Sequence, residues 1–208
     1  MKDNAIIITV FFIGCLVGWS GIAPEAIKEN NPAIYILYAL MFQVGISIGS
    51  DKNLKTMVKS LRLKMLLLPL STILGTLLFS ALISIVLTRW TVFDCLAVGS
   101  GFAYYSLSSI LITELKGASL GVQVAAELGT IALLANIMCE MMALLGTPLL
   151  ARFFGRFAPI SAAGVNSMDV ILPTITKYTG KEMTTFAIFH GILVDMSVPF
   201  FVTLFCTL

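Results

Sequence analysis

The sequence predicts an all-α polytopic membrane protein. Of its 208 residues, 58% are hydrophobic and only 12% are charged, whereas a soluble protein carries about 25% charged residues. The mean hydropathy is +0.99. A soluble core cannot bury so much apolar surface, but a bilayer accepts apolar helices of about 20 residues. We therefore expect a single transmembrane domain over residues 1–208.

Apolar segments follow one another along the whole chain. They cover residues 5–19, 33–49, 64–88, 95–112, 119–148, 160–176 and 183–207. The first is interpreted as a retained span rather than a cleaved signal peptide. The third is uniformly apolar and long enough to cross, because packed neighbours tolerate the kinks expected at Pro69 and Gly75.

The basic residues predict how the spans are oriented. The loop at residues 50–64 carries five Lys or Arg residues against one Asp, and such loops remain in the cytoplasm. Two spans precede this loop, so the N-terminus is expected inside and the C-terminus outside. Arg152 and Arg156 also fall on the cytoplasmic side if the fourth segment enters and leaves from outside.

The fourth and sixth segments are predicted to be broken or re-entrant helices. The fourth contains Gly99 and Gly101 among several serines, and the sixth contains Gly164 and Pro173. Unwound backbone survives at membrane depth only where protein or water satisfies it. A pair of interrupted segments in corresponding halves is typical of inverted-repeat transporters. Full crossings by both segments remain an alternative.

The fifth segment places a carboxylate in the middle of an apolar helix. Glu140 lies near its centre, one helical turn after Asn136, and a charge there costs about 2.5 to 3.5 kcal/mol on insertion scales. One interpretation is a protonated or hydrogen-bonded group that holds helices together. The other is a carboxylate that faces a cavity, binds a cation and exchanges it for a proton.

The sixth segment contributes a second candidate, Asp169. Because Pro173 lacks an N–H and disfavours helix before it, the turn around Asp169 is expected to have free backbone groups that suit a cation. Asp169 could equally cap a half-helix. The other predicted substrate-binding side chains are Tyr104, Tyr105, Ser106, Ser108, Asn136, Asn166, His190 and Asp195.

These candidates have plainer interpretations too. Tyr104 and Tyr105 have two interpretations. Their rings can bind an ammonium group, or they can simply pack at the membrane interface. A single histidine such as His190 is more often a hydrogen-bonded core residue. Its helical angle to Asp195, about 140°, makes a direct pair doubtful.

Several classes of function are disfavoured. A net charge of +2 is too small to indicate nucleic-acid binding. The cysteines show no metal-ligand spacing, and no nucleophile lies near a base, so we expect no enzyme, metal or cofactor. Asp94, Glu114 and Lys116 are expected to be loop charges.

Four ordered stretches carry a family resemblance. "SGFAYYSLSSILITE", "LLANIMCEMMALLGTPLLAR", "NSMDVILPTI" and "HGILVDMSVP" resemble the bacterial inner-membrane L-lysine exporter family. The resemblance covers this whole chain but only the C-terminal part of a full-length member. It implies export of L-lysine, and of its analogues, across the cytoplasmic membrane, coupled either to protons or to the membrane potential. It also implies that Glu140 is required, that Asp169 occupies the Ser-Met-Asp motif, and that Tyr105 and Ser106 occupy the Tyr-Ser motif.

The chain departs from the family pattern in three places. Cys139 stands where an arginine commonly precedes the glutamate, and Asp195 stands where a serine is usual. The first helices of a full-length member have no counterpart here, so we expect a separate short membrane subunit of about three helices. A homo-oligomer is left open. The competing hypotheses are a carrier for another cationic solute or ion, and a membrane subunit that does not transport.

Overall fold

The computed structural model describes residues 13, 16–17, 20, 42, 46 and 63–208. The chain divides into two compact units, Met1–Ile46 and Ser47–Leu208. In the first unit, the six described residues are helical. Most of the predicted segments 5–19 and 33–49, and most of the basic loop at 50–64, lie outside the described residues.

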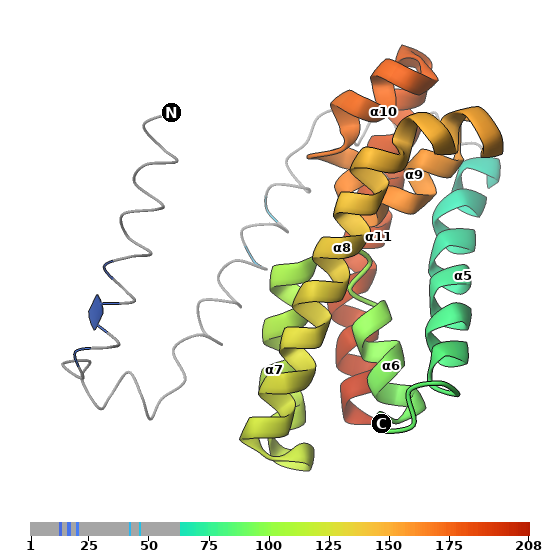
Figure 1. Cartoon of the computed structure of the whole chain (residues 1–208). Helices are drawn as coiled ribbons and strands as arrows, with labels where there is room; N and C mark the ends of the chain where they lie inside the picture. The colour runs from blue at the N-terminus through green and yellow to red at the C-terminus, as the bar shows by residue number, and fades with distance from the viewer. Residues whose placement is uncertain (1–12, 14–15, 18–19, 21–41, 43–45, 47–62) are drawn as a thin grey trace. The chain divides into compact units, whose positions relative to one another are not determined.

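From Leu63 onward the chain is helical, and no strand occurs in the described part (Figure 1). This confirms the all-α prediction for these residues. In chain order the elements are η1 (Leu63–Leu66), α5 (Leu67–Ile83), α6 (Val92–Gly99), α7 (Tyr105–Leu120), α8 (Val122–Phe154), α9 (Ala158–Ala163), η2 (Gly164–Met168), α10 (Leu172–Thr179), η3 (Lys181–Met183) and α11 (Thr184–Thr207).

Two helical stretches are long and apolar enough to cross a membrane. One is α8, with 33 residues and a hydropathy of 1.9, and the other runs through η3 and α11, with 27 residues and a hydropathy of 1.8. Both match predicted segments. On α8, Leu134, Met138 and Leu145 are more than half exposed, as expected for a helix face that meets lipid.

The fourth predicted segment forms two helices, α6 and α7, separated by residues 100–104, which we call the first break. At the first break Phe102 and Ala103 have φ angles of 45° and 70°, in the left-handed region that only glycine adopts at low cost. In Figure 1, α6 leads away from the end of the helical bundle that holds the C-terminus, and α7 returns to that end.

The sixth predicted segment is interrupted as well. Between α9 and α10 lie η2 and an irregular turn, and we call residues 164–171 the second break. Gly164 begins it with a φ of 56°, and Pro173 lies in the first turn of α10. In Figure 1, α9 and α10 lie toward the end of the bundle opposite to the one where α6 begins and α7 ends.

A buried apolar cluster fixes the second interrupted segment against α8 and α11. Its members include Ala143 from α8, Ile160 from α9, Ile175 from α10 and Ala187 from α11. All four are at most 2% exposed. The first interrupted segment is held by the close packing of α7 along α8 and by α11.

Candidate functional site

The two breaks, 62 to 63 residues apart in the chain, touch each other. The backbone N–H of Val165 donates to the carbonyl of Phe102 at 3.0 Å. The Asn166 side-chain amide donates to the Ala103 carbonyl at 3.2 Å. A Cβ on Gly164 would collide with the Phe102 carbonyl oxygen, so this close approach requires glycine.

Asn136 of α8 holds the first break from the side. Its Oδ1 accepts the N–H of Ala103 at 2.8 Å. Its Nδ2 donates to the carbonyls of Ala132 at 2.8 Å and Val98 at 3.3 Å, with Ser108 Oγ at 3.4 Å. Asn136 is 3% exposed and Ser108 is fully buried. The break therefore exists because a side-chain amide replaces the backbone partners that a continuous helix would supply.

His190 of α11 holds the second break in a similar way. Its Nδ1 lies 3.0 Å from Ser167 Oγ, and its Nε2 lies 3.0 Å from Thr72 Oγ1. Ser167 donates to the carbonyl of Ala187, so its oxygen is left to accept from Nδ1. Thr72 continues the chain of contacts to Ser161 Oγ at 2.7 Å. His190 has no exposed surface. Its ring links α11 to η2 and α5, and Thr72 extends the contacts to α9.

The predicted acidic residues do not gather at one point. Glu140 is half-buried on α8, and Asp169 is exposed in the second break. Asp195 on α11 is 5% exposed. Among the described residues, no three His, Cys, Asp or Glu side chains lie close enough to hold a metal. The roles predicted for these carboxylates stay predictions.

The remaining predicted residues surround the first and second breaks. Tyr104 is half-buried and directly precedes α7, whereas Tyr105 and Ser106 are exposed in its first turn. Asn166 is half-buried and contacts the first break. The candidates from the fourth, fifth and sixth segments are thus partly brought together, through Asn136, Ser108 and Asn166.

A cavity of about 290 Å³ reaches both breaks. It lies among α5, α6, α8 and α9, with Phe102 and Gly164 in its wall. Its walls are mainly apolar, with Asn136 contributing from α8. Glu140, Asp169 and Asp195 are not among its lining residues, so the cavity and these predicted carboxylates are separate features of this conformation.

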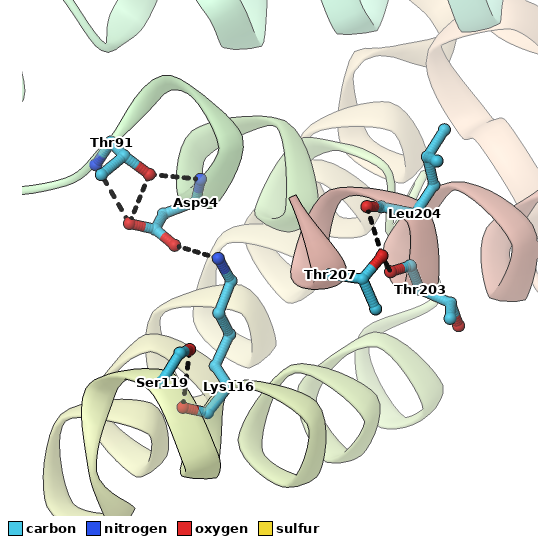
Figure 2. Close-up of polar contacts among 7 residues, drawn as sticks. All are labelled: Thr91, Asp94, Lys116, Ser119, Thr203, Leu204 and Thr207. Carbon is cyan, nitrogen blue, oxygen red and sulfur yellow. Dashed lines mark hydrogen bonds and ion pairs between the residues drawn. The ribbon is translucent and has the colours of Figure 1, made fainter.

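The structure also contains a buried ion pair where the sequence predicted loop charges. Asp94 is 2% exposed and Lys116 is 7% exposed, and Lys116 Nζ lies 3.0 Å from Asp94 Oδ1 (Figure 2). The prediction was wrong for both residues because α6 begins at Val92 and α7 extends to Leu120, which places both charges between helices.

A capping motif fixes the carboxylate of this pair. The Thr91 hydroxyl accepts the N–H of Asp94 at 3.1 Å, while Asp94 Oδ2 accepts the Thr91 N–H at 3.0 Å and the Thr91 hydroxyl at 2.7 Å. This capping box starts α6. The Thr91–Asp94 spacing in "TVFD" was the available sequence signal for a helix start at this position.

Comparison with known proteins identifies the family. The chain matches the family model for the lysine exporter LysO over residues 8–206. It belongs to the lysine exporter family. This membership confirms the resemblance, and together with the two apolar helices it supports a membrane protein.

Two curated relatives of this lysine exporter family differ in length. The chain is 29% identical over 201 residues to the lysine exporter LysO of Escherichia coli strain K12, covering 94% of this chain and 62% of that protein. It is 27% identical over 203 residues to a putative lysine exporter of Haemophilus influenzae, covering 96% of each. The chain therefore spans less than two-thirds of the E. coli relative. No solved structure gives a significant match.

Proposed function

We propose that this protein exports L-lysine across the bacterial inner membrane in exchange for protons. The observation that carries the proposal is the meeting of two interrupted helices, hydrogen-bonded to each other beside a cavity. Interrupted helices with free backbone groups are the usual binding elements of secondary transporters. The names of the two relatives supply the choice of lysine.

The proposed architecture is an inverted repeat. Helix α5 followed by α6 and α7 forms one half, and α8 followed by α9 and α10 forms the other, because each half is a long helix followed by an interrupted segment. The halves run in opposite directions, since α6–α7 and α9–α10 approach from opposite ends of the bundle (Figure 1). Both segments would then re-enter the membrane, α6–α7 from outside and α9–α10 from inside. The N-terminus would lie inside and the C-terminus outside.

The proposed binding chemistry follows from lysine's three charges. Carboxylates at Glu140, Asp169 and Asp195 suit its two ammonium groups, and the partial positive charge at the start of α7, near Tyr104, Tyr105 and Ser106, suits its carboxylate. Asn166 lies between the breaks. Asn136, Ser108 and His190 are hydrogen-bonded to the protein in this conformation, so their predicted contact with lysine requires these bonds to open.

Coupling to protons is assigned to Glu140. Its carboxylate is half-buried on α8, the longest of the described helices, between apolar neighbours in sequence. An intramembrane carboxylate is a usual group for exchanging a proton and a cation. We infer that proton binding from outside releases lysine. An analogue of lysine with the same charges would follow the same route.

The first experiment substitutes Glu140→Gln and measures lysine efflux from vesicles with an imposed proton gradient. Efflux should fall at least tenfold because an amide of similar shape cannot exchange a proton. Glu182→Gln is the matched control, since Glu182 is exposed and pairs with Arg156, and it should transport normally. Undiminished efflux by Glu140→Gln would reject the coupling role.

The experiment also separates lysine from other cations. Counterflow measures the uptake of a labelled solute into vesicles loaded with the same unlabelled solute. It is measured for lysine, a polyamine and sodium, and exchange of sodium alone would favour the ion-carrier alternative. Absence of any counterflow would favour a subunit without transport activity.

The proposal includes a separate membrane subunit of about three helices. The reason for it is the greater length of the E. coli relative, of which this chain covers 62%, whereas it covers 96% of the H. influenzae relative. Purification from native membranes under mild detergent should recover a small hydrophobic partner. Full lysine transport by this chain alone would contradict the proposed subunit.

A further inference from the structure

The carboxylate of Asp94 is held in one position but has only one charged neighbour. Its Oδ2 is occupied by the backbone and hydroxyl of Thr91. Its Oδ1 contacts, among the described residues, the Lys116 ammonium, which lies 3.0 Å away in an ion pair (Figure 2). One oxygen therefore fixes the carboxylate to α6, and the other is paired with an alkyl ammonium.

Stability does not explain why a charged pair is kept at this place. The side chains of Lys116 and Asp94 are only 8% and 3% exposed, so both charges have lost most of their water. A buried pair of this kind adds little net stability relative to apolar residues of similar size. The capping box needs Thr91 and Asp94 but not Lys116. Lys116 therefore neutralises the charge of Asp94 and is not needed to start α6.

Asp94 also borders the cavity that reaches both breaks. It is the one charged residue among the described residues that line this cavity. Apolar side chains that line the same cavity include Leu87 and Trp90, together with Leu128 and Ile131 on α8. An apolar wall with a single carboxylate at one end matches an aliphatic chain that ends in a cation.

We propose that Asp94 forms a second binding position, at the outer end of the bundle and separate from the carboxylates named above, where it holds the side-chain ammonium of the exported lysine. Lys116 occupies this position when lysine is absent. This inference rests on the proposed function. The side chain of Lys116 is chemically identical to that of the solute, so the pair already demonstrates that Asp94 accepts a primary alkyl ammonium.

Exchange of one ammonium for another keeps the site neutral. If the carboxylate were left bare whenever the cavity emptied, its burial would be costly. Lys116 removes that cost, and it also weakens lysine binding, because the solute must displace a tethered competitor. Weak binding favours release, which an exporter needs on its exit side. Asp94 lies at the start of α6, which is the outer end of the bundle in the proposed orientation.

Four proteins test the proposal in the complex purified from its own membrane. They are the wild type, Lys116→Gln, Asp94→Asn/Lys116→Gln, and Arg156→Gln/Glu182→Gln as the matched control. The control removes an exposed ion pair elsewhere. For each, binding of labelled L-lysine is measured together with thermal unfolding, and norleucine, which lacks the side-chain ammonium, serves as the competing ligand.

Lys116→Gln should bind lysine about tenfold more tightly, because the competing ammonium is gone. Asp94→Asn/Lys116→Gln should fold like the wild type but bind lysine at least tenfold more weakly, while its affinity for norleucine stays the same. The control should match the wild type in every measurement.

Each result has a definite consequence. If the double variant binds lysine as the wild type does, Asp94 is a structural residue and the proposal is wrong. If Lys116→Gln folds and does not gain affinity, Lys116 is not a competitor and the exchange is wrong. If Lys116→Gln fails to fold, the double variant still decides the role of Asp94. A wild type that binds no lysine rejects the proposed substrate instead, which separates the two failures.

Discussion

The two interrupted helices reach the same meeting point but are held there by different chemistry. In the first interrupted segment, a buried ion pair joins α6 to α7. Its break also contains two residues other than glycine, Phe102 and Ala103, that adopt the left-handed backbone conformation. The second uses small neutral groups: Gly164 provides the sharp turn, and hydroxyls join His190 to α5 and α9.

This difference indicates which of the two segments moves more easily. Leaving a buried charge without a partner costs about 3 to 5 kcal/mol, whereas a neutral hydrogen bond contributes about 1 kcal/mol. Asp94 therefore exchanges one ammonium for another without being left bare, and α6 keeps its position during the exchange. Helices α9 and α10 have six and eight residues, whereas α6 and α7 have eight and 16. We therefore expect the second segment to rearrange during transport while the first stays in place.

The largest effect is expected where the segments touch. Gly164→Ala places a Cβ against the Phe102 carbonyl at a φ of 56°, and left-handed backbone and overpacking together cost roughly 3 kcal/mol or more. The variant should unfold at a clearly lower temperature and lose transport. Thermal unfolding in detergent and vesicle efflux measure this.

Gly75→Ala is the control for that substitution. Gly75 lies within α5, and nothing is within 4 Å of an added Cβ, so stability should stay the same or rise by up to about 1 kcal/mol. Equal behaviour of the two variants would mean that the two breaks do not need their close contact.

A smaller effect is expected at the first break. Asn136→Ala leaves the Ala103 N–H and the Val98 carbonyl without their side-chain partner, which costs roughly 2 kcal/mol. Thr130→Ala, on an exposed face of the same helix and bonded to the Ala126 carbonyl, should change the unfolding temperature little. If both substitutions have the same effect, Asn136 does not hold the first break.

The smallest effect is expected at the second break. Thr72→Val removes the hydroxyl that contacts both His190 and Ser161, at a cost of about 1 kcal/mol. Ser71→Ala removes an exposed hydroxyl that bonds only within α5 and should be neutral. A loss of stability at Thr72 larger than at Asn136 would reverse the proposed ranking of the two segments.

The interruptions were predictable from the sequence because their causes are local. Gly164 and Pro173 break a helix wherever they occur in this pattern, and the glycines before Phe102 do the same. Asn136 was predicted as a substrate-binding side chain, and in the structure it is buried and bonded to the first break. Its partner could not be identified, because the Ala103 N–H becomes free only after the first break has formed.

The ion pair was missed for a different reason. Asp94 and Lys116 are 22 positions apart, and no helical periodicity relates residues on two different helices. The same limit explains α11, where His190 and Asp195 point in different directions yet both are buried. This helix packs against α5, α6, α7 and η2, so more than one of its faces is covered. The angle between two residues on the helix does not indicate which faces are buried.

A single residue, Gly121, separates α7 from α8. With 33 residues, α8 is about 50 Å long, well beyond the roughly 30 Å of a hydrocarbon core, so it has to tilt or project from the bilayer. A joint this short leaves α7 no slack. Because α7 also packs closely along α8, the two helices tilt together, so a change in the thickness of the surrounding lipid would tilt α7 as well.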